Sequence, residues 1–326
     1  MTRVFSGIQP SGDLHLGNYL GALRHFVADQ HEHDAYFCIV DLHALTVPQD
    51  PEVLARRTLE AAAMHLAVGL DPAVCTLFVQ SHAPEHTELA WLMQCTASVG
   101  ELRRMTQFKD KALNQEAVSA ALFTYPTLMA ADILLYDTDR VPVGEDQRQH
   151  LELARDVASR FNHRFGTTFV VPSAAISKVG ARIMDLQRPT DKMSKSSVSP
   201  QGTISLLDEP GEIERKLRRA VTDTGTEVRY DPDAKPGVSN LLAILGAASG
   251  RDPSALAGDY ERYGPLKADC AESVVELLRP LQARYAELAG DPAGTHAILT
   301  EGAAKARSVA TATLHRAHRA AGLLPR

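Results

Sequence analysis

The sequence predicts an α/β fold, in which a parallel sheet is covered by helices on both faces and is followed by a C-terminal helical domain. Strand-like and helix-like segments alternate through the first half of the chain, an order typical of parallel sheets. Two of the strand-like segments, 36–40 and 76–79, are continuous apolar runs, as expected for strands buried on both faces. After about residue 187 only helix-like segments follow, separated by Gly, Pro and Asp.

The first half is expected to begin with a strand over 3–6 and a helix over 17–29, whose apolar residues recur at helical spacing. A second helix over 51–68 starts from Asp50 as its cap and Pro51 in its first turn. The remaining elements of this half are the strands 36–40, 76–79 and 140–143 and the helices 85–96 and 146–165.

Three parts of the chain are predicted: a sheet domain over 1–187, a helical domain over 188–293, and a C-terminal helix over 294–326 that packs back on the sheet domain. The helices expected after residue 187 are 212–222, 239–248, 254–263, 271–288 and 292–321. With 326 residues, 44% of them hydrophobic and 23% charged, the chain has the size and composition of a two-domain globular protein.

Composition also argues against several classes of protein. No apolar run approaches the roughly 20 residues that span a bilayer, and the N-terminus has no secretory signal. We therefore expect a cytoplasmic protein without a membrane partner. The four cysteines neither pair as C-x-x-C nor lie near histidines at zinc spacing; they are expected to be buried thiols, and no metal ligand is expected from protein side chains. They are Cys38, Cys75, Cys95 and Cys270.

The net charge of −6 and the pI near 6.1 argue against a protein that coats nucleic acid. A nucleic-acid partner would have to be held by local basic patches. The candidates are Arg103 with Arg104, Lys109 with Lys111, Lys216 with Arg218 and Arg219, and Arg316 with Arg319. Each patch alone is more often a solvated helix face than a phosphate contact.

A cationic loop, Lys192-Met193-Ser194-Lys195-Ser196, places two lysines and two serines within five residues. Such a loop suits a pentavalent phosphorus, because it puts positive charge where negative charge develops in the transition state. Lysine is a point charge on a flexible stem and can follow a phosphate through the reaction. The loop indicates nucleotidyl transfer, with Lys192 and Lys195 as the main catalytic candidates and Lys111 as an assisting one; the alternative is a solvated loop.

A turn rich in Pro and Gly, 10–18, supplies a second phosphate site. Its glycines allow a ligand to approach the backbone, and the free N–H groups at the following helix start favour phosphate. His15 and Asn18 can donate further hydrogen bonds. For His15 an equally good alternative is a polar residue that only begins the helix.

Polar residues also follow the predicted strands at 41–43, 80–82 and 144–147, where a parallel sheet binds its ligands. Asp132 lies in the apolar stretch 129–135, and an ionised acid there is costly unless a donor meets it. One reading is a carboxylate at the bottom of an apolar pocket that accepts a hydrogen bond from a ligand. The alternative, favoured from these residues alone, is a structural acid paired with an arginine such as Arg140.

These residues identify a resemblance. The chain resembles class I aminoacyl-tRNA synthetases, and within them the bacterial branch specific for tryptophan. The matching segments are 5–12, 15–19, 105–109, 124–126, 129–136, 142–147, 178–184 and 192–196. The class signature His-Ile-Gly-His stands here as His15-Leu16-Gly17-Asn18, and the final Asn is similar to the tryptophan branch.

The resemblance implies a Rossmann-type domain that holds ATP between the two motifs, and it implies roles for individual residues. The ATP-binding residues would be Gln9, Pro10, Ser11, His15, Gly17 and Asn18, with Gly144, Glu145 and Asp146 at the ribose, Ile183 at the adenine, and Lys192, Met193, Ser194, Lys195 and Ser196 over the triphosphate. The tryptophan-binding residues would be Asp132 at the indole N–H, Tyr125 and Gln147 at the ammonium group, and Phe5, Met129, Val141 and Val143 around the ring. Gln9 joins the lysines as catalytic.

The implied reaction converts L-tryptophan and ATP to tryptophanyl-adenylate and pyrophosphate, with Mg²⁺ on the triphosphate, and then transfers tryptophan to the 3′ end of tRNA(Trp). A homodimer is implied, with the helical domain of one subunit reading the anticodon of the tRNA charged by the other. One alternative is a tyrosyl-tRNA synthetase. It is disfavoured because Phe5 stands where that enzyme has a tyrosine, and because a lone Asp132 suits indole better than phenol.

A second alternative is a non-catalytic paralogue that binds a nucleotide, tRNA or a regulatory partner. The chain retains Gln9, Asp132, Lys192 and Lys195 together, a combination that a lapsed enzyme has no need to keep. The enzyme is therefore the preferred reading.

Overall fold

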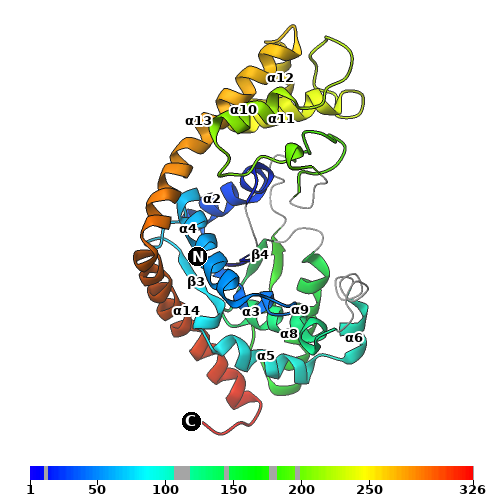
Figure 1. Ribbon diagram of the computed structural model, residues 1–326. Helices are drawn as coiled ribbons and strands as arrows, with labels where there is room; N and C mark the ends of the chain where they lie inside the picture. Colours follow the sequence, from blue (N-terminus) through cyan, green and yellow to red (C-terminus); the bar gives the residue numbers. More distant parts are fainter. Residues whose placement is uncertain (11–13, 106–117, 143–146, 176–181, 195–198, 326) are drawn as a thin grey trace.

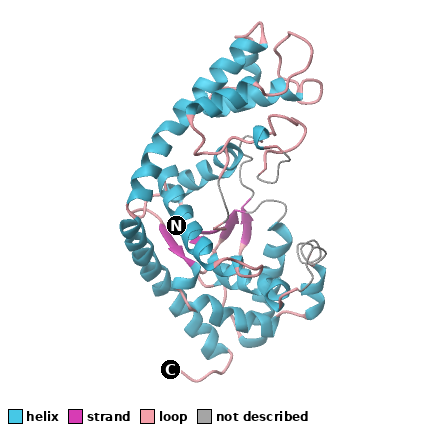
Figure 2. Ribbon diagram, viewed as in Figure 1, coloured by secondary structure: helices cyan, strands magenta, loops and turns pink. Residues whose placement is uncertain are grey.

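A five-stranded parallel sheet forms the centre of the molecule. The structure, a computed structural model, describes residues 1–10, 14–105, 118–142, 147–175, 182–194 and 199–325. The strands are β1 (Arg3–Ile8), β2 (Asp34–Ile39), β3 (Thr76–Val79), β4 (Arg140–Pro142) and β5 (Ser173–Ala175). Their order is β3-β2-β1-β4-β5, and every neighbouring pair is parallel. The predicted parallel sheet is confirmed, and Figure 2 shows it enclosed by helices.

Alternate residues of each strand face two different cores, which explains why the strands read as continuous apolar runs. On β2, Tyr36 and Cys38 pack into one core with α5 (Glu85–Thr96), α8 (Ala120–Leu134), α9 (Arg148–Phe165) and α14 (Pro292–Ala320). Phe37 and Ile39 pack into the other core with α4 (Pro51–Val68). Both faces of the sheet are therefore covered, as the alternation of strands and helices predicts.

The helices of the first half vary more than the strands from what is expected. They are α1 (Leu16–Asn18), α2 (Arg24–Glu32), α3 (Asp41–Ala44), α4 (Pro51–Val68), α5 (Glu85–Thr96), α6 (Val99–Arg104), α8 (Ala120–Leu134) and α9 (Arg148–Phe165). The expected bounds of α4, α5 and β3 are confirmed to the residue. The single helix expected over 17–29 is wrong, because a π-helical turn, Tyr19–Leu23, separates α1 from α2. The sequence does not predict α8, the helix that carries Asp132.

The helices of the second half are α10 (Pro210–Arg218), α11 (Pro236–Ser249), α12 (Pro253–Ala257), α13 (Tyr263–Gly290) and α14 (Pro292–Ala320). The helix expected over 254–263 ends at Ala257, before Gly258. The long helix α13 begins eight residues earlier than the expected 271. Its start signal is Pro265 in the first turn, where a missing backbone N–H costs nothing.

A third core joins the helices of the second half to two segments singled out in the sequence, the turn 10–18 and the cationic loop 192–196. It contains Leu16 of that turn, Met193 of that loop, and buried residues of α10, α11 and α13. Helices α13 and α14 run in succession along one side of the molecule, from α10–α12 at one end to the C-terminus at the other (Figure 1). Within the described ranges, no helix is both long and apolar enough to cross a bilayer.

Three of the four cysteines are buried thiols as expected, namely Cys38, Cys75 and Cys270. The expectation is wrong for Cys95, which is exposed on α5. The residue lies on the outer face of the helix, whereas its neighbours Leu89 and Met93 face the core.

The C-terminal helix covers the edge strand of the sheet. Helix α14 contributes Leu299 to one core and Ala306 to the other, so it lies alongside β3 and closes an edge that would otherwise be open to pairing with another chain. Gly302 makes this close approach feasible, because a Cβ atom there would collide with the Leu77 carbonyl oxygen.

Gly302→Ala is therefore expected to lower the free energy of unfolding by about 1–3 kcal/mol, the usual cost of overpacking. Urea denaturation measures it. Gly290→Ala is the matched control, because a Cβ atom at Gly290 has no heavy atom within 4 Å. Equal stability of the two variants would contradict this account of the helix–strand contact.

Buried His65 on α4 makes stability depend on pH. Its Nδ1–H donates to the Ala61 carbonyl at 2.7 Å, and burial lowers the pKa of His65 to about 4. An unfolded histidine has a pKa near 6.5, so the unfolded state binds more protons between these values. The stabilising contribution is complete above pH 6.5 and is lost as the pH falls from about 6.5 towards 4.

The expected loss over that window is about 3 kcal/mol, since each pKa unit is worth about 1.4 kcal/mol. Urea unfolding at several pH values measures it, and His65→Gln should remove this part of the slope. His163→Gln, at an exposed position of α9, should retain the slope. An identical slope in the wild type and His65→Gln would rule out His65 as its source.

Candidate active site

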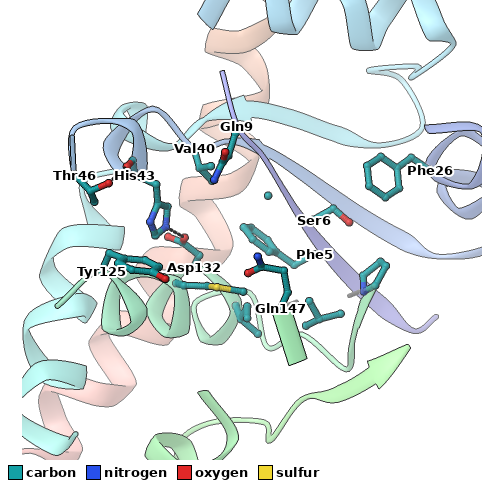
Figure 3. A pocket seen from close by; sticks show the side chains of 15 residues that line it. Phe5, Ser6, Gln9, Phe26, Val40, His43, Thr46, Tyr125, Asp132 and Gln147 are labelled. Atoms are coloured by element: carbon teal, nitrogen blue, oxygen red, sulfur yellow. Dashed lines mark hydrogen bonds and ion pairs between the residues drawn. The ribbon is translucent and has the colours of Figure 1, made fainter. Parts of the chain in front are cut away.

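A pocket of about 380 Å³ lies at the carboxyl ends of β1, β2 and β4. Its lining residues are Phe5, Ser6, Gly7, Gln9, Phe26, Val40, His43, Thr46, Tyr125, Met129, Asp132, Ile133, Val141, Pro142 and Gln147. Seven of these lining residues were predicted from the sequence as site residues. Gln9 was predicted to bind ATP, and the other six to bind the amino acid: Phe5, Tyr125, Met129, Asp132, Val141 and Gln147. Figure 3 shows Asp132 and His43 facing each other on one wall, with Tyr125 beside them.

Asp132 sits in the wall of this pocket on α8 with an exposed fraction of 2%. Its Oδ2 accepts from His43 Nε2 at 2.8 Å. Its Oδ1 accepts from Gln80 Nε2 at 2.7 Å and from His86 Nδ1 at 2.6 Å. The expected pairing of Asp132 with Arg140 is therefore wrong, because its donors are two histidines and a glutamine. The expectation that Asp132 is the lone polar group of the pocket wall is also wrong.

The donors decide the charge of Asp132. Burial alone raises its pKa, but the charge and hydrogen bond of His43 and the hydrogen bond of His86 outweigh burial and hold the pKa of Asp132 below its usual range. The side chain is therefore ionised at neutral pH and can only accept hydrogen bonds. A group that offers an N–H to this wall meets a charged acceptor.

Tyr125 presents a protonated phenol to the pocket. Burial raises its pKa to about 12, and its hydroxyl shares a hydrogen bond of 2.6 Å with His150 Nε2. The ring of Tyr125 meets the edge of the His43 ring, with centroids 6.1 Å apart. Gln147 lies across the pocket, at the residue that precedes α9 (Figure 3). Two neutral polar side chains thus face the charged one.

The end of the turn 10–18 is fixed by hydrogen bonds between His15 and Asn18. His15 precedes α1, accepts at Nδ1 from the Asn18 backbone N–H at 3.3 Å, and donates its own backbone N–H to Asn18 Oδ1 at 3.1 Å. This reciprocal arrangement is a capping box. His15 therefore caps the start of the helix through its backbone N–H and its Nδ1.

The two motifs touch, although they are far apart in sequence. A Cβ atom at Gly17 would lie 3.5 Å from Met193 Cβ. Met193 is itself buried, and its N–H donates to the Ile183 carbonyl at 3.1 Å. Lys192 forms an antiparallel bridge with Met184, and the Ser194 carbonyl accepts from Thr203 Oγ1 at 3.1 Å. The first part of the cationic loop is therefore anchored beside the glycine turn.

Several predicted site residues lie outside the described ranges, and the structure assigns them no position. They are Ser11, Lys111, Val143, Gly144, Glu145, Asp146, Lys195 and Ser196.

In two of the predicted basic patches, one residue forms an ion pair within the protein. Lys216 is buried, and its Nζ donates to Asp208 at 2.6 Å and to the Thr203 carbonyl at 2.8 Å. Arg316 is bonded to Asp137. The prediction of a surface patch is wrong for Lys216. Exposed arginines of these patches are Arg103, Arg104, Arg218, Arg219 and Arg319, whereas Lys109 lies outside the described ranges.

Three residues that define the site were not predicted as site residues: His43, Gln80 and His86. His43 and Gln80 lie in the strand-end segments 41–43 and 80–82, so their position carried a signal. His86 follows Glu85 in the first turn of α5. There it read as an ordinary helix residue, and no local pattern distinguished it.

Comparisons with known proteins agree with this geometry. The model of the family tRNA synthetases class I (W and Y) matches residues 1–279. A tryptophan–tRNA ligase of Streptomyces coelicolor is 55% identical over 330 residues, which cover 100% of this chain and 98% of the relative.

Two crystal structures share the fold over nearly the whole length. Tryptophanyl-tRNA synthetase of Mycoplasma pneumoniae is 37% identical with a TM-score of 0.88, and the match covers 99% of this chain and 98% of that one. The Campylobacter jejuni enzyme, in a complex with ADP and tryptophan, is 36% identical with a TM-score of 0.86, covering 99% and 100%. The family match and the full-length identity together show that this chain belongs to the class I tRNA synthetases of the W and Y family.

Proposed function

We propose that this protein activates L-tryptophan with ATP, forming tryptophanyl-adenylate and pyrophosphate, and then transfers tryptophan to the 3′ end of tRNA(Trp). The observation that carries the proposal is the ionised Asp132 acceptor in the wall of a pocket of about 380 Å³. This pocket belongs to a chain that is 55% identical to a tryptophan–tRNA ligase along its whole length.

In the amino-acid site, the indole N–H donates to Asp132. Phe5, Met129 and Val141 line the pocket around the ring, and Val143 completes it. Tyr125 and Gln147 hold the ammonium group with neutral oxygens. The rings and apolar side chains supply burial, and the charged acceptor supplies orientation.

In the ATP site, the turn with Gln9, Pro10 and Ser11 and the helix start at His15, Gly17 and Asn18 receive the nucleotide. Gly144, Glu145 and Asp146 hold the ribose, and the backbone at Ile183 meets the adenine. The segment Lys192, Met193, Ser194, Lys195 and Ser196 closes over the triphosphate. The related Campylobacter jejuni enzyme was crystallised with ADP and tryptophan, which supports adjacent sites for the two substrates.

The activation step needs no side-chain base. The carboxylate of tryptophan is already ionised and attacks the α-phosphorus, while the bond from that phosphorus to the bridging oxygen breaks and pyrophosphate leaves. Lys192 and Lys195, with Gln9 and Lys111, stabilise the charge that spreads over the phosphate oxygens.

Mg²⁺ would be held by the phosphates of ATP. The described residues gather no group of three or more His, Cys, Asp or Glu side chains able to hold a metal ion.

The remaining parts of the chain serve the tRNA. The catalytic domain is 1–187, the helical domain 188–293 reads the anticodon, and the C-terminal helix 294–326 supports the catalytic domain. The exposed Arg218 and Arg219 of the helical domain suit the phosphate backbone. The reaction takes place in the cytoplasm, where its substrates are available.

The active form is a homodimer whose contact surface includes Trp91 and Val99. These apolar side chains are 64% and 58% exposed in the single chain, and Cys95 is exposed between them. Trp91 is the one tryptophan of the sequence, so its fluorescence reports on the surface directly. Sedimentation of the protein as a dimer, with an emission shift to longer wavelength on dilution, would support this partner; a fully active monomer would exclude it.

Tyrosine is the second candidate substrate, because one structural observation favours it. His43 lies against Asp132, so the pocket wall carries a second polar side chain and the acid is not the lone acceptor from which tyrosine was disfavoured. The polar groups of the wall therefore do not separate the two amino acids, and the full-length relatives favour tryptophan.

ATP–pyrophosphate exchange, run side by side with tryptophan and tyrosine, tests the proposal. Exchange with tryptophan and little with tyrosine is the expected result. Preference for tyrosine would keep the mechanism and overturn the substrate. Absence of exchange with either, from folded protein with Mg²⁺ present, would favour the non-catalytic paralogue.

A further inference from the structure

A buried line of polar groups runs behind Asp132, away from the pocket. Its Oδ1 accepts from His86 Nδ1 at 2.6 Å, and His86 Nε2 lies 2.7 Å from the Tyr136 hydroxyl. Both His86 and Tyr136 have an exposed fraction of 0%, and neither lines the pocket. Their polar atoms therefore reach the site through the Asp132 carboxylate and not directly.

The chemistry of the three groups decides the direction of each hydrogen bond. An ionised carboxylate only accepts, so the proton of His86 resides on Nδ1. In a neutral imidazole the other nitrogen then accepts, and the Tyr136 hydroxyl donates to Nε2. Burial raises the pKa of Tyr136 well above its usual value, which keeps that donor protonated. Tyr136 thus selects the tautomer in which His86 donates to Asp132.

The aromatic surroundings hold Tyr136 in this position. Its ring stacks on Phe5, with centroids 5.5 Å apart and an interplanar angle of 9°, and on Tyr36 at 4.9 Å. Phe5 is also a wall of the pocket. The ring that carries the hydroxyl is therefore packed against the amino-acid site itself.

Helix α14 holds the two ends of the line from outside. Glu85, directly before His86, accepts from Arg307 Nε at 3.1 Å and from Thr311 Oγ1 at 2.9 Å. Asp137, directly after Tyr136, is bonded to Arg316. His86 and Tyr136 are thus each next in sequence to an acidic residue that is bonded to an arginine of α14.

The two carboxylate oxygens of Asp132 consequently have different hydrogen-bond partners. Oδ1 is committed to Gln80 and His86, both fully buried. Oδ2 meets His43, which lines the pocket (Figure 3). We propose that His86 and Tyr136 are positioning residues, which orient the Asp132 carboxylate so that Oδ2 faces the ring N–H of the substrate. This assignment rests on the proposed function.

The test uses two substrates that differ at one atom. They are L-tryptophan and β-(3-benzothienyl)alanine, in which sulfur replaces the indole N–H. In the wild type, kcat/KM for pyrophosphate exchange should favour tryptophan by about 10- to 100-fold, the effect of a hydrogen bond to a charged group.

Tyr136→Phe keeps the ring stack and removes only the hydroxyl. It is expected to raise the KM for tryptophan about fivefold, as the loss of one neutral hydrogen bond would, and to leave the KM for ATP and the kinetics with the sulfur analogue unchanged. His86→Ala should abolish the preference for tryptophan, and His86→Asn should restore part of it, because its amide can donate to Oδ1 in place of Nδ1. A general structural defect would not follow this pattern.

Tyr36→Phe is the matched control, since it removes another buried tyrosine hydroxyl next to the same stack; it should leave both substrates unaffected. An unchanged preference in Tyr136→Phe and His86→Ala, or an equal rise of the KM values for ATP and tryptophan, would overturn the inference alone. A wild type without tryptophan-dependent exchange would overturn the proposed function first, so the two failures are distinguishable.

Discussion

Asp132→Asn is expected to lower kcat/KM for tryptophan about 100-fold and to leave the KM for ATP near its wild-type value. A hydrogen bond to a charged group is worth about 1.5–3 kcal/mol, and an amide in place of Oδ2 offers either a neutral acceptor or a donor that repels the ring N–H. The same change removes the charge that His43, Gln80 and His86 converge on. The loss should therefore concentrate on the amino acid.

Pyrophosphate exchange at varied tryptophan and ATP concentrations measures this loss. Asp156→Asn, at an exposed position of α9, controls for a change of net charge. Because the pKa of Asp132 is depressed in the folded protein, its stabilising contribution is present above the ordinary value near 4 and is lost only as the pH falls below it. Assays between pH 6 and 8 are thus free of its titration. Wild-type kinetics in Asp132→Asn would show that another group receives the substrate.

Lys195→Ala is expected to slow adenylate formation by about 100- to 1,000-fold, comparable to removing one preorganised donor from a developing anion, while the affinity for tryptophan stays unchanged. The prediction for Lys195 rests on the motif, because the residue lies outside the described ranges. The described part of the loop supports it: Met193 is anchored to Ile183 and lies next to Gly17. The described part of the loop therefore lies beside the glycine turn, where we propose that the triphosphate binds.

Rapid-quench measurement of tryptophanyl-adenylate in a single turnover separates this chemistry from tRNA transfer. Lys192→Ala should show the same defect, and Lys305→Ala, at an exposed position of α14, should behave as the wild type. Adenylate formation at the wild-type rate in both loop variants would remove the lysines from the mechanism.

The sequence by itself determined those elements whose signals are local. Asp50 caps α4 and Pro51 begins it, so the start of that helix follows from two adjacent residues. The apolar run of β3 and the periodicity of α5 were sufficient to set their bounds. The π-helical turn after Asn18 was not predictable, because the residues there are those of an ordinary helix and the core that buries its Leu20 and Leu23 is assembled from distant segments of the chain.

The site shows the same division. The two motifs and Asp132 were visible as residues, since an acid in an apolar stretch and a lysine pair in a short loop are local patterns. The partners of Asp132 were not, because His43, Gln80 and His86 are 89, 52 and 46 residues away. Sequence spacing alone pointed to Arg140, which is much nearer along the chain.

Only the tertiary structure decided which groups pair with Asp132 and keep it ionised. The strand order places the ends of β2 and β3 beside α8, where His43 and Gln80 donate to one carboxylate, and α5 adds the third donor, His86. Helix α14, the last element of the chain, reaches the same network through Glu85 and Asp137. The physical reason is range: capping and periodicity act over a few residues, whereas the charge of a buried carboxylate depends on groups that meet only when the whole sheet is assembled.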